Sequence, residues 1–119
     1  MTLFLPSALA QTSEYVSPRG SQKQVVEVQS DPAGTNELLD AWIADKKWTH
    51  IVTHRYSPGG GHSYYRYEID CATMYGHHLG TGQTIEKVML NRADPLVLPV
   101  TPKSKEESLY RAGCKAVGR

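Results

Sequence analysis

The chain has 119 residues and a mass of 13.2 kDa, enough for one compact domain with a modest hydrophobic core. Thirteen Lys and Arg residues against twelve Asp and Glu residues give a formal net charge of +1. This balance disfavours nucleic-acid binding, which depends on a dense positive field. After the first ten residues, no apolar run approaches the ~20 residues that a membrane-spanning helix needs. We therefore expect a small binding domain with no nucleic-acid partner and no membrane insertion.

The first ten residues resemble the second half of a secretory signal peptide. They are mostly apolar and end in Ala8-Leu9-Ala10, a small-x-small pattern that signal peptidase accepts. A basic start is missing, so the alternatives are a frayed apolar terminus and a short buried strand. We interpret residues 1–10 as a partial signal peptide, residues 11–23 as a flexible lead-in and residues 24–119 as a single domain.

Two cysteines, Cys71 and Cys114, bear on the compartment. An even count in a small exported chain favours one disulfide between them, and two buried free thiols of a cytosolic protein are the alternative. Neither cysteine stands in a Cys-x-x-Cys pair, which disfavours redox catalysis and a zinc ribbon. The expected location is the periplasm or the cell surface.

The domain is predicted to begin with a strand and a helix. Residues 24–29 predict a short strand, and residues 36–47 predict an amphipathic helix that would lie on a sheet. The helix prediction rests on four apolar residues at the i, i+1, i+4 and i+5 positions of one stripe: Leu38, Leu39, Trp42 and Ile43.

A β-hairpin is predicted next. Residues 48–56 and 63–72 predict two strands joined by the glycine-rich turn 57–62. Alternation along the second strand places one set of side chains inward: Tyr65, Tyr67, Ile69 and Cys71. It places the other set outward: Tyr64, Arg66, Glu68 and Asp70.

The rest of the chain predicts short elements. Residues 73–84 predict an irregular loop, and residues 84–91 and 96–100 predict strands, the second of them short or at an edge because of its prolines. Ser-Lys-Glu-Glu from Ser104 is a capping box that opens a short helix. The expected fold is α+β: a small antiparallel β-sheet with a packed α-helix, a short C-terminal helix and one disulfide.

Aromatic and basic residues gather on the predicted hairpin. Tyr64 and Arg66 on its outward face, with Tyr56 and Arg55 nearby, form a patch of the kind enriched in binding hot spots. The alternative is cross-strand pairing that only stabilises the sheet.

Five histidines raise the question of a metal: His50, His54, His62, His77 and His78. His50 and His54 lie four apart on one strand face and are weak candidate ligands. However, the chain has no His-Glu-x-x-His motif and no carboxylate spaced to complete a recognised site. Solvated or hydrogen-bonding histidines are the favoured interpretation, so no cofactor is expected. A P-loop and a Gly-x-Ser-x-Gly elbow are also missing, and we expect no catalysis.

Three motifs lie within residues 63–114: Tyr67-Glu-Ile-Asp-Cys71, Val97-Leu-Pro-Val-Thr-Pro102 and Ser104-Lys-Glu-Glu-Ser-Leu-Tyr-Arg-Ala-Gly-Cys114. Together they resemble the surface-adhesin protein E family. The resemblance implies a small antiparallel sheet with a packed helix, a disulfide at Cys71 and Cys114, and an exported bacterial protein. Some members act as adhesins for host matrix and serum components. Two departures are the stretch Ala72-Thr-Met-Tyr75 in place of basic residues and the helix predicted at 36–47 in place of strands.

The expected function is that of an exported bacterial, non-catalytic protein-binding domain. It would be an accessory subunit of an envelope or surface assembly, or a surface adhesin, and its partner would be another protein. The accessory role is favoured because the chain lacks a strong basic patch. Two alternatives are a secreted inhibitor of a hydrolase, presenting loop 57–62 or 73–84, and a small His-based metalloprotein.

Overall fold

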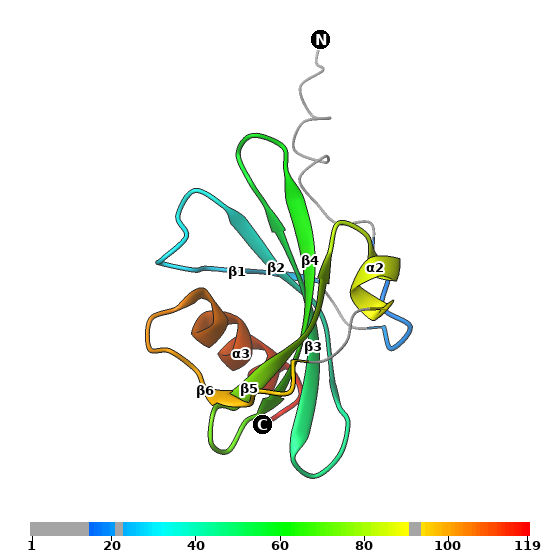
Figure 1. The fold of residues 1–119 in the computed structure, drawn as a ribbon, viewed down its shortest axis with the longest axis vertical. Helices are drawn as coiled ribbons and strands as arrows, with labels where there is room; N and C mark the ends of the chain where they lie inside the picture. Colours follow the sequence, from blue (N-terminus) through cyan, green and yellow to red (C-terminus); the bar gives the residue numbers. More distant parts are fainter. Residues whose placement is uncertain (1–14, 21–22, 91–93) are drawn as a thin grey trace.

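The structure, a computed structural model, describes residues 15–20, 23–90 and 94–119. In this part of the chain, six antiparallel strands form one sheet in sequential order, so that each strand pairs with its neighbour in sequence (Figure 1). The strands are β1 (Gln24–Val26), β2 (Thr35–Ile43), β3 (Trp48–Tyr56), β4 (His62–Asp70), β5 (Tyr75–Gly82) and β6 (Leu98–Pro99). The helices are α2 (Ile85–Leu90) and α3 (Lys105–Ala116).

The sheet is covered on both faces, with α3 on one side and α2 on the other (Figure 1). The main core lies between the sheet and α3 and contains Leu38, Ile51, Tyr67, Ile69, Leu109, Tyr110 and Cys114. A smaller core on the α2 side contains Leu39, Val52, Tyr64 and Val88. The α+β fold class expected from the sequence is confirmed. The helix that packs in the main core is α3.

The helix predicted at residues 36–47 is wrong, because this segment contains β2. A β-bulge shifts the register between Leu38 and Asp40 and leaves Leu39 as the extra residue. Leu38 therefore packs in the α3-side core, whereas Leu39 packs in the α2-side core. The adjacent Leu38 and Leu39 are thus buried on opposite faces of β2. Together with Trp42 and the exposed Ile43, they imitate the spacing of one helical stripe.

Two further segments differ from their predictions. The loop predicted at 73–84 contains β5, and the strand predicted at 84–91 contains α2, whose first turn is capped by the Thr84 hydroxyl accepting from the Lys87 N–H at 3.2 Å. The glycines of β5 mark close approach rather than a loop. A Cβ on Gly76 would lie 2.8 Å from Tyr110 Cε2 and 2.9 Å from the Glu68 carbonyl oxygen.

Other predictions are confirmed. β3 and β4 form the expected hairpin, with Tyr56 opposite His62 at its end. β6 is the short edge strand expected within 96–100. Ser104 caps α3: its hydroxyl accepts from the Glu107 N–H at 3.1 Å, and Glu107 in turn accepts from the Lys103 N–H at 3.0 Å.

The predicted Cys71–Cys114 disulfide is present, with the two Cα atoms 5.9 Å apart. It joins the residue after β4 to the last turns of α3. No helix in the described residues is long and apolar enough to span a membrane.

The predicted partial signal peptide, residues 1–10, lies outside the described residues. Part of the predicted lead-in is described and contacts β2. Tyr15 donates its hydroxyl to Asp40 at 2.9 Å, and the Arg19 guanidinium pairs with the same carboxylate at 2.7 Å.

Candidate binding pocket

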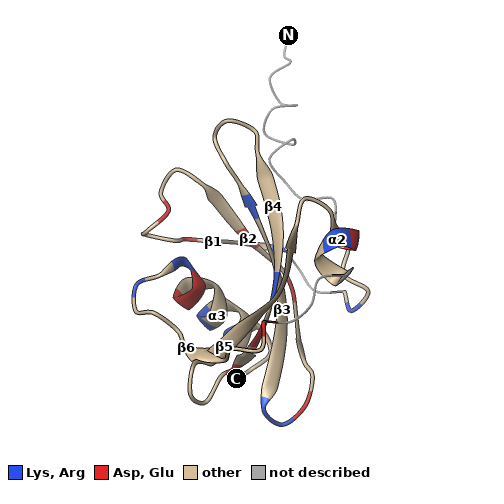
Figure 2. Cartoon of the chain, viewed as in Figure 1, with Lys and Arg blue, Asp and Glu red and all other residues tan. Residues whose placement is uncertain are grey.

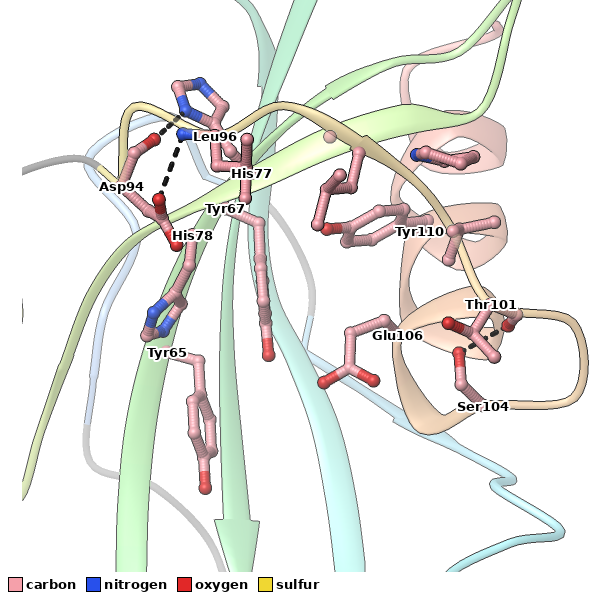
Figure 3. A pocket seen from close by; sticks show the side chains of 14 residues that line it. Tyr65, Tyr67, His77, His78, Asp94, Leu96, Thr101, Ser104, Glu106 and Tyr110 are labelled. Carbon is pink, nitrogen blue, oxygen red and sulfur yellow. Dashed lines mark hydrogen bonds between the residues drawn. The ribbon is translucent and has the colours of Figure 1, made fainter.

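A pocket of about 340 Å³ lies between strands β4 and β5, the N-terminal half of α3 and residues 94–101 (Figure 3). The sheet side of the pocket floor comes from Tyr65 and Tyr67 of β4 and from His78 of β5, which is opposite Tyr67 in the strand register. Alternation along β4 places both tyrosines on the face that α3 covers, as the sequence predicted.

Aromatic rings form the floor of this pocket. The Tyr65 and Tyr67 rings are stacked with centroids 6.2 Å apart, and Tyr110 of α3 meets Tyr67 edge to face at 5.5 Å. The His78 ring lies 5.3 Å from Tyr67 on the other side. The floor is thus a continuous aromatic surface contributed by three elements.

The pocket carries negative charge. Glu106 of α3 directs its carboxylate toward Tyr67 in Figure 3, and Asp94 stands at the far end. None of the described residues that line the pocket is Lys or Arg. Within the described part of the chain, the Glu106 side chain makes neither a hydrogen bond nor an ion pair. The Glu106 carboxylate is therefore available to accept hydrogen bonds from water or from a ligand in the pocket.

The rings of Tyr67, Tyr110 and His78 supply no positive charge to compensate the Glu106 carboxylate. Burial, reinforced by the charge of Glu106, raises the pKa of Tyr67 well above its usual value and that of Tyr110 to about 12. Burial also lowers the pKa of His78, whose Nε2 lies 2.5 Å from the Thr81 hydroxyl. Near neutral pH these rings are therefore uncharged.

An apolar rim borders the pocket. Leu96, Val97 and Leu98 are consecutive and are 59 %, 36 % and 52 % exposed. Leu98 pairs with Gly76 at the edge of the sheet, so the rim is fixed to the same strands that carry the pocket. On another side, the Lys105 ammonium lies 4.2 Å from the centroid of the Tyr65 ring.

The patch predicted around Tyr64 and Arg66 is not an exposed surface as expected. Tyr64 is only 9 % exposed and packs in the α2-side core, with its ring 4.3 Å from that of His54. The outward face of β4 is covered because α2 and Tyr15 lie on it. Arg66 is partly buried, and its Nε has no hydrogen-bond partner among the described residues.

The two neighbouring candidates have structural contacts. Arg55 binds Asp31 with both Nε and Nη2 at 2.6 Å, which ties the turn before β2 to β3. The Tyr56 ring meets the His54 ring edge to face at 4.1 Å. The role of these four residues in binding stays a prediction.

The two candidate metal ligands lie in different networks on the same face of β3. His54 is buried, with Nδ1 3.2 Å from Glu37 Oε1 and Nε2 2.9 Å from His62 Nδ1. Burial, together with the charge of His62, lowers the pKa of His54 to about 4.

His50 and His77 share one carboxylate. Their Nε2 atoms lie 2.5 Å and 2.7 Å from the two oxygens of Glu68. In the described residues, no group of three or more His, Cys, Asp and Glu side chains is arranged to hold a metal ion. His50 and His77 are thus both hydrogen-bonded, and the expectation that the histidines bind no metal stays a prediction.

Sequence reasoning missed the pocket, although part of its signal was present. Tyr65 and Tyr67 were assigned to the inner face, and Glu106 and Tyr110 share a helix face by their i, i+4 spacing. The pocket also needs residues 94–101, and no local pattern indicates that this segment returns to β5.

The chain matches no family model, no curated protein and no solved structure. The resemblance to the surface-adhesin protein E family therefore stays a prediction, and the function has to be argued from the site itself.

Proposed function

We propose that this chain is a non-catalytic domain that binds another protein outside the reducing cytosol, through the pocket and the apolar rim. The observation that carries the proposal is the rim. Leu96, Val97 and Leu98 stay exposed beside a pocket, although the same chain buries both faces of its sheet. Contiguous exposed apolar side chains next to polar groups are typical of protein interaction sites.

The compartment part of the proposal is supported by the Cys71–Cys114 disulfide, because such bonds persist in oxidising compartments and are rare in the cytosol. The signal-like residues 1–10 point in the same direction. We infer an exported bacterial protein of the periplasm or cell surface. An accessory subunit of an envelope assembly is favoured over an adhesin because basic residues are spread over several elements among acidic ones (Figure 2).

Site-specific photo-crosslinking in the native host tests the binding surface. A photoreactive amino acid at Leu98 should give one discrete adduct with a partner protein. The same probe at Val25, which is also exposed but lies on β1 at the opposite edge of the sheet, should give none. Leu96→Asp should weaken the Leu98 adduct, with the fold checked by circular dichroism. Equal adducts at both positions, or an adduct that Leu96→Asp leaves unchanged, would contradict the proposed surface.

The compartment is tested by the intact mass of the protein recovered from its host, with and without reduction before alkylation. Cleavage after Ala10 and thiols that react only after reduction are the expected results. An uncleaved chain with two free thiols would remove the export part of the proposal.

A further inference from the structure

We propose that the pocket binds a cationic side chain, a lysine ammonium or an arginine guanidinium, between Glu106 and the hydroxyl of Tyr67, over the aromatic floor. That this cation comes from a partner protein rests on the proposed function. The chemistry of the site is argued independently, from three features of the pocket.

The first feature is the unpaired charge of Glu106. The next acidic residue, Glu107, has its own partner in Arg111, with Nη2 3.2 Å from Oε2. Lys105, on the other side in sequence, lies over the Tyr65 ring instead of pairing with Glu106. With Asp94, the described lining residues supply two carboxylates and no Lys or Arg, and the nearby cation Lys105 is held at the Tyr65 ring, so the lining favours positive charge.

The second feature is the hydroxyl of Tyr67. The residue lines the pocket and is only 4 % exposed, yet in the described part of the chain its hydroxyl makes no hydrogen bond. Figure 3 shows this hydroxyl on the same side of the pocket as the Glu106 carboxylate. A phenol oxygen can accept from the N–H groups of an ammonium or guanidinium, so one cation could bind the Tyr67 hydroxyl and Glu106 together.

The third feature is the aromatic floor. An ammonium or guanidinium is attracted by the face of a tyrosine ring within about 6 Å of its centroid. Lys105 already shows this contact at Tyr65, which lines the pocket. A volume of about 340 Å³ is at the low end of the ~300–1,000 Å³ range of small-molecule sites, which suits one side chain better than a large cofactor.

Binding of small side-chain analogues to the full chain tests the proposal. Nα-acetyl-lysine methylamide and Nα-acetyl-arginine methylamide would be titrated by NMR against Nα-acetyl-norleucine methylamide, a neutral analogue of lysine. The cationic compounds should shift the amide signals of Gly76, His78 and Glu106 in a saturable way, and the neutral compound should not. Glu106→Gln should weaken cation binding at least about fivefold, whereas Glu86→Gln on α2 should leave it unchanged.

Each outcome decides the proposal. Equal shifts with the norleucine compound, no saturable shift with either cation, or unchanged affinity in Glu106→Gln would overturn it. Tyr67→Phe gives a second test that removes only a hydroxyl, and it should reduce but not abolish cation binding. If the cations fail to bind while the Leu98 crosslink persists, the protein-binding function stands and the cation site alone is wrong.

Discussion

His54 is buried within the sheet between Glu37 and His62, and its protonation couples folding to pH. Its pKa is lowered from 6.5 to about 4 in the folded protein. The unfolded chain therefore takes up a proton between about pH 6.5 and 4 that the folded protein does not. The contribution of His54 to the free energy of unfolding is therefore complete above pH 6.5. It falls by up to about 3 kcal/mol as the pH decreases to 4. Urea unfolding at pH 7 and at pH 4.5 measures the loss.

The matched control is His54→Gln, which keeps a hydrogen-bonding side chain of similar size without a titrating group. Its stability should depend less steeply on pH in the same window. A smaller slope should remain because burial also lowers the pKa of His78, which acts in the same direction. An unchanged slope in the variant would show that His54 is not the group responsible.

Asp31 holds Arg55 with two hydrogen bonds and also accepts from the Asn36 side chain at 2.8 Å. These bonds hold the pKa of Asp31 well below its usual value. Asp31→Asn should cost about 1–2 kcal/mol of stability at pH 7. The difference from wild type should shrink below about pH 4, because the contribution of a carboxylate with a lowered pKa is lost as pH falls. A stability difference between Asp31→Asn and wild type that stays constant down to pH 2 would argue against a stabilising ion pair between Asp31 and Arg55.

Helix α3 lies tightly against the sheet at Gly113, where an added Cβ would overlap the Ile51 side chain of β3. In an exposed helix, Gly→Ala stabilises by up to about 1 kcal/mol. Here the close approach reverses the sign, and Gly113→Ala should destabilise by about 1–3 kcal/mol, measured by chemical unfolding.

Gly59→Ala serves as the control for this substitution, since a Cβ there meets nothing within 4 Å. It should change stability by no more than about 0.5 kcal/mol. If Gly113→Ala were as neutral as the control, α3 would have to sit farther from β3 than described.

The hairpin of β3 and β4 and the helix α3 could be predicted because their signals are local: β-branched residues, a glycine-rich turn and a capping box at Ser104. β2 could not, because burial of the adjacent Leu38 and Leu39 reflects cover on both faces and a bulge at Leu39, which depend on the rest of the fold. Tyr64 was misplaced for the same reason, since its face of β4 is covered by the short helix α2. The pocket is harder still to predict, because β4, β5, α3 and the segment 94–101 meet there only in the folded chain.

The disulfide affects the whole molecule, since it closes a loop of about 44 residues that contains β5, α2, β6 and most of α3. Most of the pocket wall outside β4 therefore lies inside this loop. The chain-entropy estimate for that loop length is about 4 kcal/mol, which is large against the ~5–15 kcal/mol stability of a typical domain. The double variant Cys71→Ala, Cys114→Ala should lose stability of this order in urea unfolding.

The same variant links stability to the site. Without the crosslink, α3 is held on the sheet by its apolar face and by contacts at its two ends, Lys105 over Tyr65 and Arg119 with Thr49. Opening of α3 should therefore expose the pocket tyrosines before the β3–β4 hairpin unfolds. Hydrogen exchange should then show lost protection in α3 and β5, with protection in β3 largely kept. Reduction of the wild-type protein should reproduce this pattern, because it breaks the same covalent bond. A double variant within about 1 kcal/mol of wild type, with protection in α3 unchanged, would mean that packing of Leu109 and Tyr110 alone positions the helix.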